Sequence, residues 1–115
     1  MSITIAIDAM GGDFAPAHPV TGAVMAAREL GARILLVGRS DAIENELRKH
    51  ETAGLPIDIQ HASEIVSMDE SPVTAFRRKK DSSIRIATNC VRDGRAQGFV
   101  SAGNTGAVMA TLSRV

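Results

Sequence analysis

Short apolar runs alternate along the chain with segments in which apolar residues recur every three or four positions. The runs predict strands at 3–8, 33–38, 57–61 and 97–101. The run at 33–38 is almost entirely apolar, as expected for a parallel strand that is covered on both faces.

The segments with helical spacing lie between these runs. One helix is expected over 16–30 and ends at Gly31. A shorter helix follows Ser40, which is expected to be its N-cap, with Ile43 and Leu47 on one face.

Two more helices are predicted between the third and fourth strands. The Ser-Pro pair at 71–72 is typical of a helix start, and this short helix ends in a basic run at 77–80. Asp81 or Ser82 is expected to cap the next helix, which Gly94 ends.

This alternation of strand and helix predicts an α/β fold with a parallel sheet. The 115 residues are enough for one small domain. The last helix carries Val108, Leu112 and Val115 at helical spacing and then stops without a cap. We therefore expect residues 1–115 to be the N-terminal part of a single, larger α/β domain.

Composition narrows the possible functions. Aromatic residues make up 3% of the chain, with no Trp or Tyr, so the core must be aliphatic. Thirteen basic and 13 acidic residues give a net charge of zero. Neither the charge nor the aromatic content favours nucleic-acid binding. No apolar run approaches the ~20 residues of a membrane helix, and the first residues do not resemble a signal peptide.

The single cysteine, Cys90, excludes an internal disulfide and fits a reducing cytoplasm. Because Cys90 falls within a predicted helix among apolar residues, we expect a small buried hydrophobe rather than a nucleophile. The three histidines show no metal-ligand spacing, and His18 is expected at the surface. No metal or cofactor is predicted.

A run of small and hydroxyl-bearing residues, SAGNTG at 101–106, joins the fourth strand to the last helix. Backbone N–H groups in such a turn point outward, and the helix dipole adds partial positive charge, which favours binding of phosphate or another small anion. No lysine follows the final glycine, so this is not a Walker A motif. The alternative is an ordinary turn, in which Asn104 or Ser101 caps the helix and the glycines permit tight packing.

A second candidate site, DAMGGD at 8–13, lies at the carboxyl end of the first strand, where ligands of open α/β sheets bind. Gly11 and Gly12 permit a ligand to approach the backbone, and Asp8 and Asp13 are suited to orienting a substrate or water. The alternative is a glycine turn whose Asp side chains accept hydrogen bonds from nearby amides.

A third candidate, RRKKDSS at 77–83, forms a local positive patch in a neutral chain. Three interpretations of this run are open: a solvated helix end, a phosphate contact, or a docking site for an acidic protein. The residues available for such contacts are Arg77, Arg78, Lys79, Lys80, Ser82 and Ser83.

Together these runs resemble the bacterial phosphate acyltransferases of phospholipid synthesis, the PlsX family. The matching segments are IAIDAMGGDFAP at 5–16, LLVG at 35–38, HASEIVSMDESP at 61–72, RRKKDSSIRIA at 77–87 and VSAGNTGAVMA at 100–110. They occur in family order over nearly the whole chain, and their combination is specific although each run alone is not.

The resemblance implies that the complete protein transfers a fatty acyl group from acyl carrier protein to inorganic phosphate, giving acyl phosphate. It implies a three-layer, Rossmann-like, mainly parallel sheet, similar to isocitrate dehydrogenase and phosphotransacetylase and incomplete in this chain. It also implies a cytoplasmic homodimer without a cofactor. Peripheral association with the inner face of the membrane would involve parts that this chain lacks.

The resemblance gives each candidate run a role, while the catalytic residue stays unidentified. Phosphate and oxyanion donors are expected from Ser101, Gly103, Asn104, Thr105 and Gly106. The opposite wall of the cleft is expected from Asp8, Gly11, Gly12 and Asp13. The basic run would provide secondary phosphate contacts or meet the acidic carrier protein.

Because family members are much longer, the chain alone is expected to be inactive or nearly so. Two other functions stay open: a phosphotransacetylase-like enzyme that acts on acyl-CoA, and a non-catalytic module that binds phosphate or nucleotide. A fragment that does not fold stably is a third alternative, because missing sheet neighbours would leave apolar surface exposed.

Overall fold

The computed structural model describes residues 3–112 and contains a parallel four-stranded sheet in the order β3-β2-β1-β4. The strands are β1 (Thr4–Asp8), β2 (Arg33–Gly38), β3 (Ile57–His61) and β4 (Gly98–Val100). In the register of the sheet, Ile7 lies between Leu36 of β2 and Val100 of β4. The carboxyl ends of β1 and β4 therefore lie side by side.

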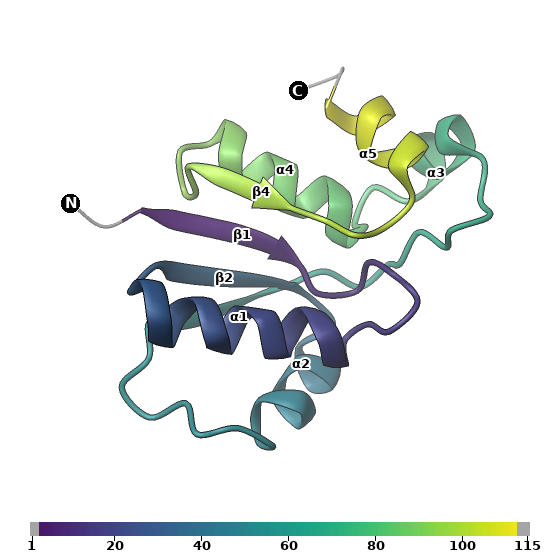
Figure 1. Ribbon diagram of the computed structural model, residues 1–115. Coiled ribbons are helices and arrows are strands. Elements are labelled where there is room, and N and C mark those ends of the chain that lie inside the picture. The colour runs from purple at the N-terminus through teal and green to yellow at the C-terminus, as the bar shows by residue number, and fades with distance from the viewer. Residues whose placement is uncertain (1–2, 113–115) are drawn as a thin grey trace.

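Helices cover both faces of this sheet, which gives the three-layer α/β arrangement (Figure 1). On one face lie α1 (Ala17–Leu30) and α2 (Ser40–Leu47). On the other lie α3 (Pro72–Arg78), α4 (Ser83–Arg92) and α5 (Thr105–Leu112), with α4 against the strands and α5 between α4 and α3. Within residues 3–112, no helix is both long enough and apolar enough to cross a membrane.

The central strand β2 explains why residues 33–38 are almost entirely apolar. Successive side chains of a strand point to opposite faces, and both faces of β2 are covered. Ile34 and Leu36 pack with α1 and α2, whereas Leu35 and Val37 pack with α4. Leu36 is fully buried at the centre of the α1 side.

The elements predicted from the sequence are confirmed to within one or two residues at their ends. The predicted cap of α4 is Ser82, whose Oγ accepts a hydrogen bond from the Arg85 N–H at 3.1 Å. Gly94, with a φ of 80°, follows the last turn of that helix as expected. The predicted continuation of the last helix to Val115 lies outside the described residues.

The predicted N-cap role of Ser40 is wrong. Arg39 is the N-cap of α2, and Ser40 is already the first helical residue. Parallel pairing of β2 with β3 places His61 opposite Gly38, close to Ser40. The Ser40 Oγ and N–H lie 2.9 and 3.2 Å from His61 Nδ1. The hydroxyl group therefore joins α2 to the end of β3 instead of capping its own helix.

Cys90 is buried between α4 and the sheet, together with Ala6 and Leu35, as the sequence predicts. Removal from water disfavours the charged thiolate, so burial raises the pKa of the Cys90 thiol. A protonated, buried thiol packs as a small apolar side chain.

The packing of β2 makes Leu36 the strongest single test of this fold. Leu36→Ala should lower the free energy of unfolding by about 2–5 kcal/mol, because it removes buried methyl groups and leaves a cavity. Leu30→Ala is the matched control, since Leu30 is 79% exposed, and it should change stability by less than about 0.5 kcal/mol. Urea unfolding followed by circular dichroism measures both variants, and equal effects would contradict this description of the core.

Candidate active site

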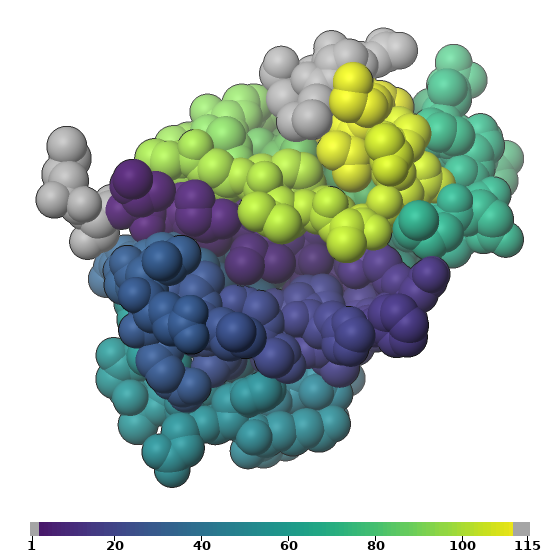
Figure 2. All heavy atoms as spheres, in the orientation of Figure 1, coloured from purple at the N-terminus to yellow at the C-terminus, as the bar shows by residue number. Residues whose placement is uncertain are grey.

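The order of the strands places a candidate ligand site at the carboxyl ends of β1 and β4. The chain proceeds from β1 to β2 and β3 on one side and then returns to add β4 on the other side of β1. Ligands of open parallel sheets bind in the crevice where the strand order reverses in this way. The turns that follow β1 and β4 meet at this crevice and border one another on the face shown in Figure 2.

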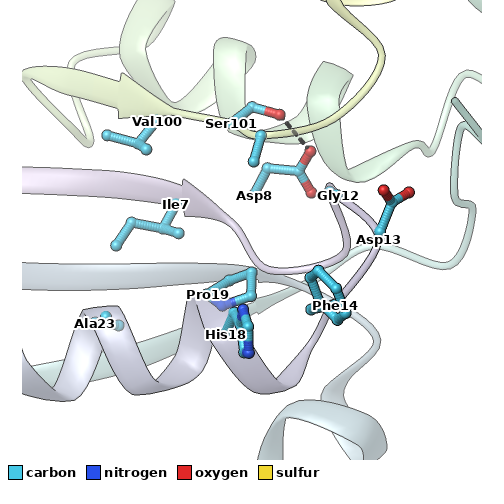
Figure 3. A pocket seen from close by; sticks show the side chains of 13 residues that line it. Ile7, Asp8, Gly12, Asp13, Phe14, His18, Pro19, Ala23, Val100 and Ser101 are labelled. Carbon is cyan, nitrogen blue, oxygen red and sulfur yellow. Dashed lines mark hydrogen bonds between the residues drawn. The ribbon is translucent and has the colours of Figure 1, made fainter.

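A cavity of about 450 Å³ lies at this position (Figure 3), within the range of ~300–1,000 Å³ that is common for small-molecule sites. It is bounded by the end of β1, the turn after it, the start of α1 and the end of β4. Its lining residues are Ile7, Asp8, Gly11, Gly12, Asp13, Phe14, His18, Pro19, Gly22, Ala23, Val100, Ser101 and Ala102.

A hydrogen bond between Asp8 and Ser101 joins the first two candidate sites into one. The Ser101 hydroxyl donates to Asp8 Oδ2 at 2.8 Å, and the Gly103 N–H donates to Ser101 Oγ at 3.0 Å. Asp8 Oδ1 accepts from the Met10 N–H at 3.1 Å. The Asp8 side chain is therefore held by both turns. The residue is only 2% exposed, so these hydrogen bonds replace those that water would make.

Two glycines allow the turns to approach this closely. A Cβ atom on Gly11 would lie 2.6 Å from Asp8 Oδ2 and 2.8 Å from the Gly103 nitrogen. Gly12 has a φ of 94°, which side-chain-bearing residues rarely adopt. Any larger residue at position 11 would push the two turns apart and disturb the Asp8–Ser101 hydrogen bond.

Of the predicted anion-binding residues after β4, Ser101 lines the cavity, whereas Gly103, Asn104, Thr105 and Gly106 do not. Some backbone N–H groups of the two turns are still available as donors. Within the described part of the chain, the N–H groups of Gly12, Thr105 and Gly106 donate to no hydrogen bond. Thr105 and Gly106 form the first turn of α5, where the helix dipole is positive. The Ser101 hydroxyl is engaged by Asp8, so backbone groups are better placed than this hydroxyl to donate to an anion.

Asn104 has a structural role that the anion prediction did not include. Its Oδ1 accepts from the Ala107 N–H at 3.0 Å, which confirms the capping alternative. Its Nδ2 lies 2.9–3.2 Å from the carbonyl oxygens of Ser67, Met68 and Glu70. The side chain thus attaches the loop at 62–71 to the start of α5.

The basic run divides into engaged and exposed residues, and none of it lines the cavity. The Lys79 ammonium donates to the carbonyl of Ile65 at 2.5 Å and forms an ion pair with Glu70. Ser82 caps α4, as described above, and Ser83 is buried beside it with its N–H donating to the Glu64 carbonyl. Arg77, Arg78 and Lys80 are exposed.

Two carboxylates of the loop at 62–71 and its surroundings are stabilised in their charged forms. The hydrogen bond from Lys79 lowers the pKa of Glu70 below its ordinary value of 4.5, helped by the Ser67 N–H. Hydrogen bonds from the hydroxyl and N–H of Ser63 lower the pKa of Asp81 below 3.8. The loop is therefore attached near Ser63 by Asp81, and near Glu70 by both Lys79 and Asn104.

The sequence prediction missed the apolar wall of the cavity. Phe14 is 66% exposed and stacks on the His18 ring with centroids 4.8 Å apart. His18 is at the surface, as expected, and also lines the cavity. A signal was present in the sequence, because Phe14 follows Asp13 directly in a chain with three aromatic residues.

Within residues 3–112, no three His, Cys, Asp or Glu side chains gather as metal ligands.

Residues 3–115 match the sequence model of the family described as fatty acid synthesis protein. The chain belongs to this family. It is 60% identical over 108 residues to a phosphate acyltransferase of Heliobacterium modesticaldum, a match that covers 92% of this chain and 32% of that protein.

Two further relatives carry the same name. A phosphate acyltransferase of Geobacter sulfurreducens is 57% identical over 106 residues, covering 92% of this chain and 31% of its own length. One of Koribacter versatilis is 49% identical over 116 residues, covering 100% and 32%. This member of the fatty acid synthesis protein family thus spans about a third of the length of the curated relatives that it matches.

In this family member, the two functions of Asn104 can be separated by substitution. Asn104→Asp keeps an acceptor for the Ala107 N–H but loses the donors to the loop, so it should destabilise the fold by about 2–3 kcal/mol. Asn104→Ala should cost about 1 kcal/mol more, because the cap is lost as well. Urea unfolding gives both values, and amide exchange at 67–70 should accelerate in each variant. Wild-type stability of Asn104→Asp would contradict the attachment.

The Glu70–Lys79 pair should make stability depend on pH. Because the folded-state pKa of Glu70 is lowered, its contribution is present at neutral pH and is lost as the pH falls through the folded pKa. The free energy of unfolding of the wild type should therefore fall as the pH drops below about 4.5, and that of Glu70→Gln should fall less. Asp81 is unchanged in both proteins, so their difference isolates Glu70. Parallel pH curves would contradict this role.

Proposed function

We propose that this chain forms the N-terminal part of an enzyme that transfers a fatty acyl group from acyl carrier protein to inorganic phosphate. The observation that carries the proposal is the cleft between the turns after β1 and β4, which is polar at one end and apolar along the rest. The relatives named phosphate acyltransferase support it, since the product of such a transfer is an acyl phosphate. This product would enter phospholipid synthesis.

The proposed reaction needs no nucleophile from the protein. A phosphate oxygen attacks the carbonyl carbon of the thioester, a C–O bond forms and the C–S bond breaks. The proton of the monohydrogen phosphate ends on the departing thiolate, which leaves as the free thiol of the carrier protein. The protein has to hold the two reactants in line and to stabilise the negative charge that develops on the carbonyl oxygen.

The proposed phosphate position is next to the turns after β1 and β4. The donors would be the unengaged N–H groups of Gly12, which lines the cavity, and of Thr105 and Gly106, which begin α5 outside the cavity lining. Asp8 would not meet the phosphate as a bare charge, because its oxygens already accept from Ser101 and Met10. In this arrangement Asp8 and Ser101 are positioning residues that fix the shape of the two turns.

The proposed partner is acyl carrier protein, which is acidic. The exposed Arg77, Arg78 and Lys80 are the part of the basic run that is free to meet it, since Lys79 is paired with Glu70. The complete protein is proposed to be a cytoplasmic homodimer that associates peripherally with the membrane, as the family resemblance implies. Because the relatives are about three times as long as the chain, we propose that the chain alone is inactive or nearly so.

The test joins residues 3–112 of this chain to the remainder of the Heliobacterium modesticaldum relative, in place of the matching segment. Palmitoyl carrier protein and phosphate should give acyl phosphate, trapped with hydroxylamine and measured by mass spectrometry. Ser101→Ala should lower kcat/KM by about tenfold or more, because the two turns lose their link. Thr74→Ala, which removes an exposed hydroxyl group outside the cleft, should have no effect.

The alternatives predict different results in the same experiment. Faster transfer from acyl-CoA than from acyl carrier protein would favour a phosphotransacetylase-like enzyme. Saturable phosphate binding without any transfer would favour a non-catalytic module. Full activity of the 115-residue chain by itself would contradict the proposal that the chain is an inactive part.

A further inference from the structure

The cleft is amphiphilic along its length. In Figure 3, Ile7, Val100 and Ala23 gather at one end, and Asp8, Ser101 and Asp13 lie toward the other. Ile7 packs with the α1 cluster that includes Ala23, and Val100 is the register partner of Ile7, so both strand residues lie on the α1-facing side of the sheet. A ligand that fits both ends has a polar head and a hydrocarbon tail.

Helix α1 borders this cleft with one face. His18, Pro19, Gly22 and Ala23 are spaced as neighbours along a helix face, and all four line the cavity. The residues of the first turn are bulky, whereas Gly22 and Ala23 are small. The cleft therefore continues past the first turn of α1, where the small residues Gly22 and Ala23 do not fill it.

Gly22 is an unusual residue for its position. It lies inside α1, where glycine is less favourable than alanine. A Cβ atom at Gly22 would meet nothing within 4 Å, so packing against the rest of the fold does not require glycine there. The helix thus carries an unfavourable residue at a point where its side chain would project into the open cleft.

We propose that Gly22 determines the length of acyl chain that the cleft accepts. The carbonyl end of the chain lies near Asp8 and Ser101, and the methylene groups extend along α1, past Gly22, toward Ile7 and Val100. The inference rests on the proposed function, because it takes the acyl group as the ligand. To the proposed function it adds the path of the acyl chain and the residue that limits the length of that chain. Each methylene group buried along this path should raise the affinity about fourfold.

The test measures binding without thioester or phosphate, so it is independent of acyl transfer. The 115-residue chain is titrated with palmitate and octanoate, below their micelle concentrations, by displacement of a fluorescent fatty acid. The wild type should bind palmitate at least about tenfold more tightly than octanoate. Gly22→Leu should weaken palmitate binding about tenfold or more and change octanoate binding less than about threefold.

Two variants serve as controls. Gly22→Ala adds a single methyl group and should retain palmitate binding within about threefold. Glu29→Leu adds the same leucine to an exposed position of α1 that does not line the cavity, and it should leave both affinities unchanged. Circular dichroism establishes that each variant is folded, and Gly22→Met replaces Gly22→Leu if the latter unfolds.

The outcomes separate this inference from the proposed function. Unchanged palmitate binding by Gly22→Leu, or equal weakening by Glu29→Leu, would overturn the role of Gly22. In the joined enzyme described above, Gly22→Leu should reduce activity with palmitoyl carrier protein and spare octanoyl carrier protein. Equal loss with both substrates would indicate that the remainder of the longer protein occupies the cleft, which also overturns it. If binding depends on chain length as expected but the joined enzyme transfers no acyl group to phosphate, only the proposed function is contradicted.

Discussion

The hydrogen bond between Asp8 and Ser101 is the contact on which the geometry of the candidate site depends. A buried carboxylate is costly unless donors surround it, and Asp8 obtains one from its own turn and one from the turn after β4. The two turns are 93 residues apart in the sequence, and parallel pairing of β1 with β4 brings them together. The glycines at 11 and 103 then let the backbones approach closely enough for the bond to form.

The rest of the cleft follows from this fixed end. Because the turns are held together at Asp8, the cavity opens along α1 and the apolar side of β1 and β4. Asn104 holds the start of α5 against the loop at 62–71, so the first N–H groups of that helix keep a constant direction. In the proposed reaction, a fixed polar end and an open apolar side would align the charged nucleophile with the acyl chain.

Neighbouring residues of the basic run have different surroundings although they look equivalent in the sequence. Lys79 turns inward to the Ile65 carbonyl and Glu70, while Arg78 and Lys80 on either side of it are exposed. The inward position of Lys79 has a physical cause. The partner of Lys79 is a carboxylate nine residues earlier, and the loop that carries this carboxylate is positioned by Asn104, far along the chain.

The sequence by itself determined the strands, most helix ends and the turns that form the site, because apolar spacing, Ser82 and the glycines act locally. It also indicated that the runs after β1 and β4 belong to a ligand site, since strand ends carry ligands in such sheets. Only the tertiary structure decided which polar groups stay available. The partners of Asn104, Ser101, Lys79 and Ser40 lie in other loops or strands, so no local pattern reveals them. The apolar wall beside Gly22 likewise exists only once α1 packs against the sheet, because its lining residues come from α1, β1 and β4.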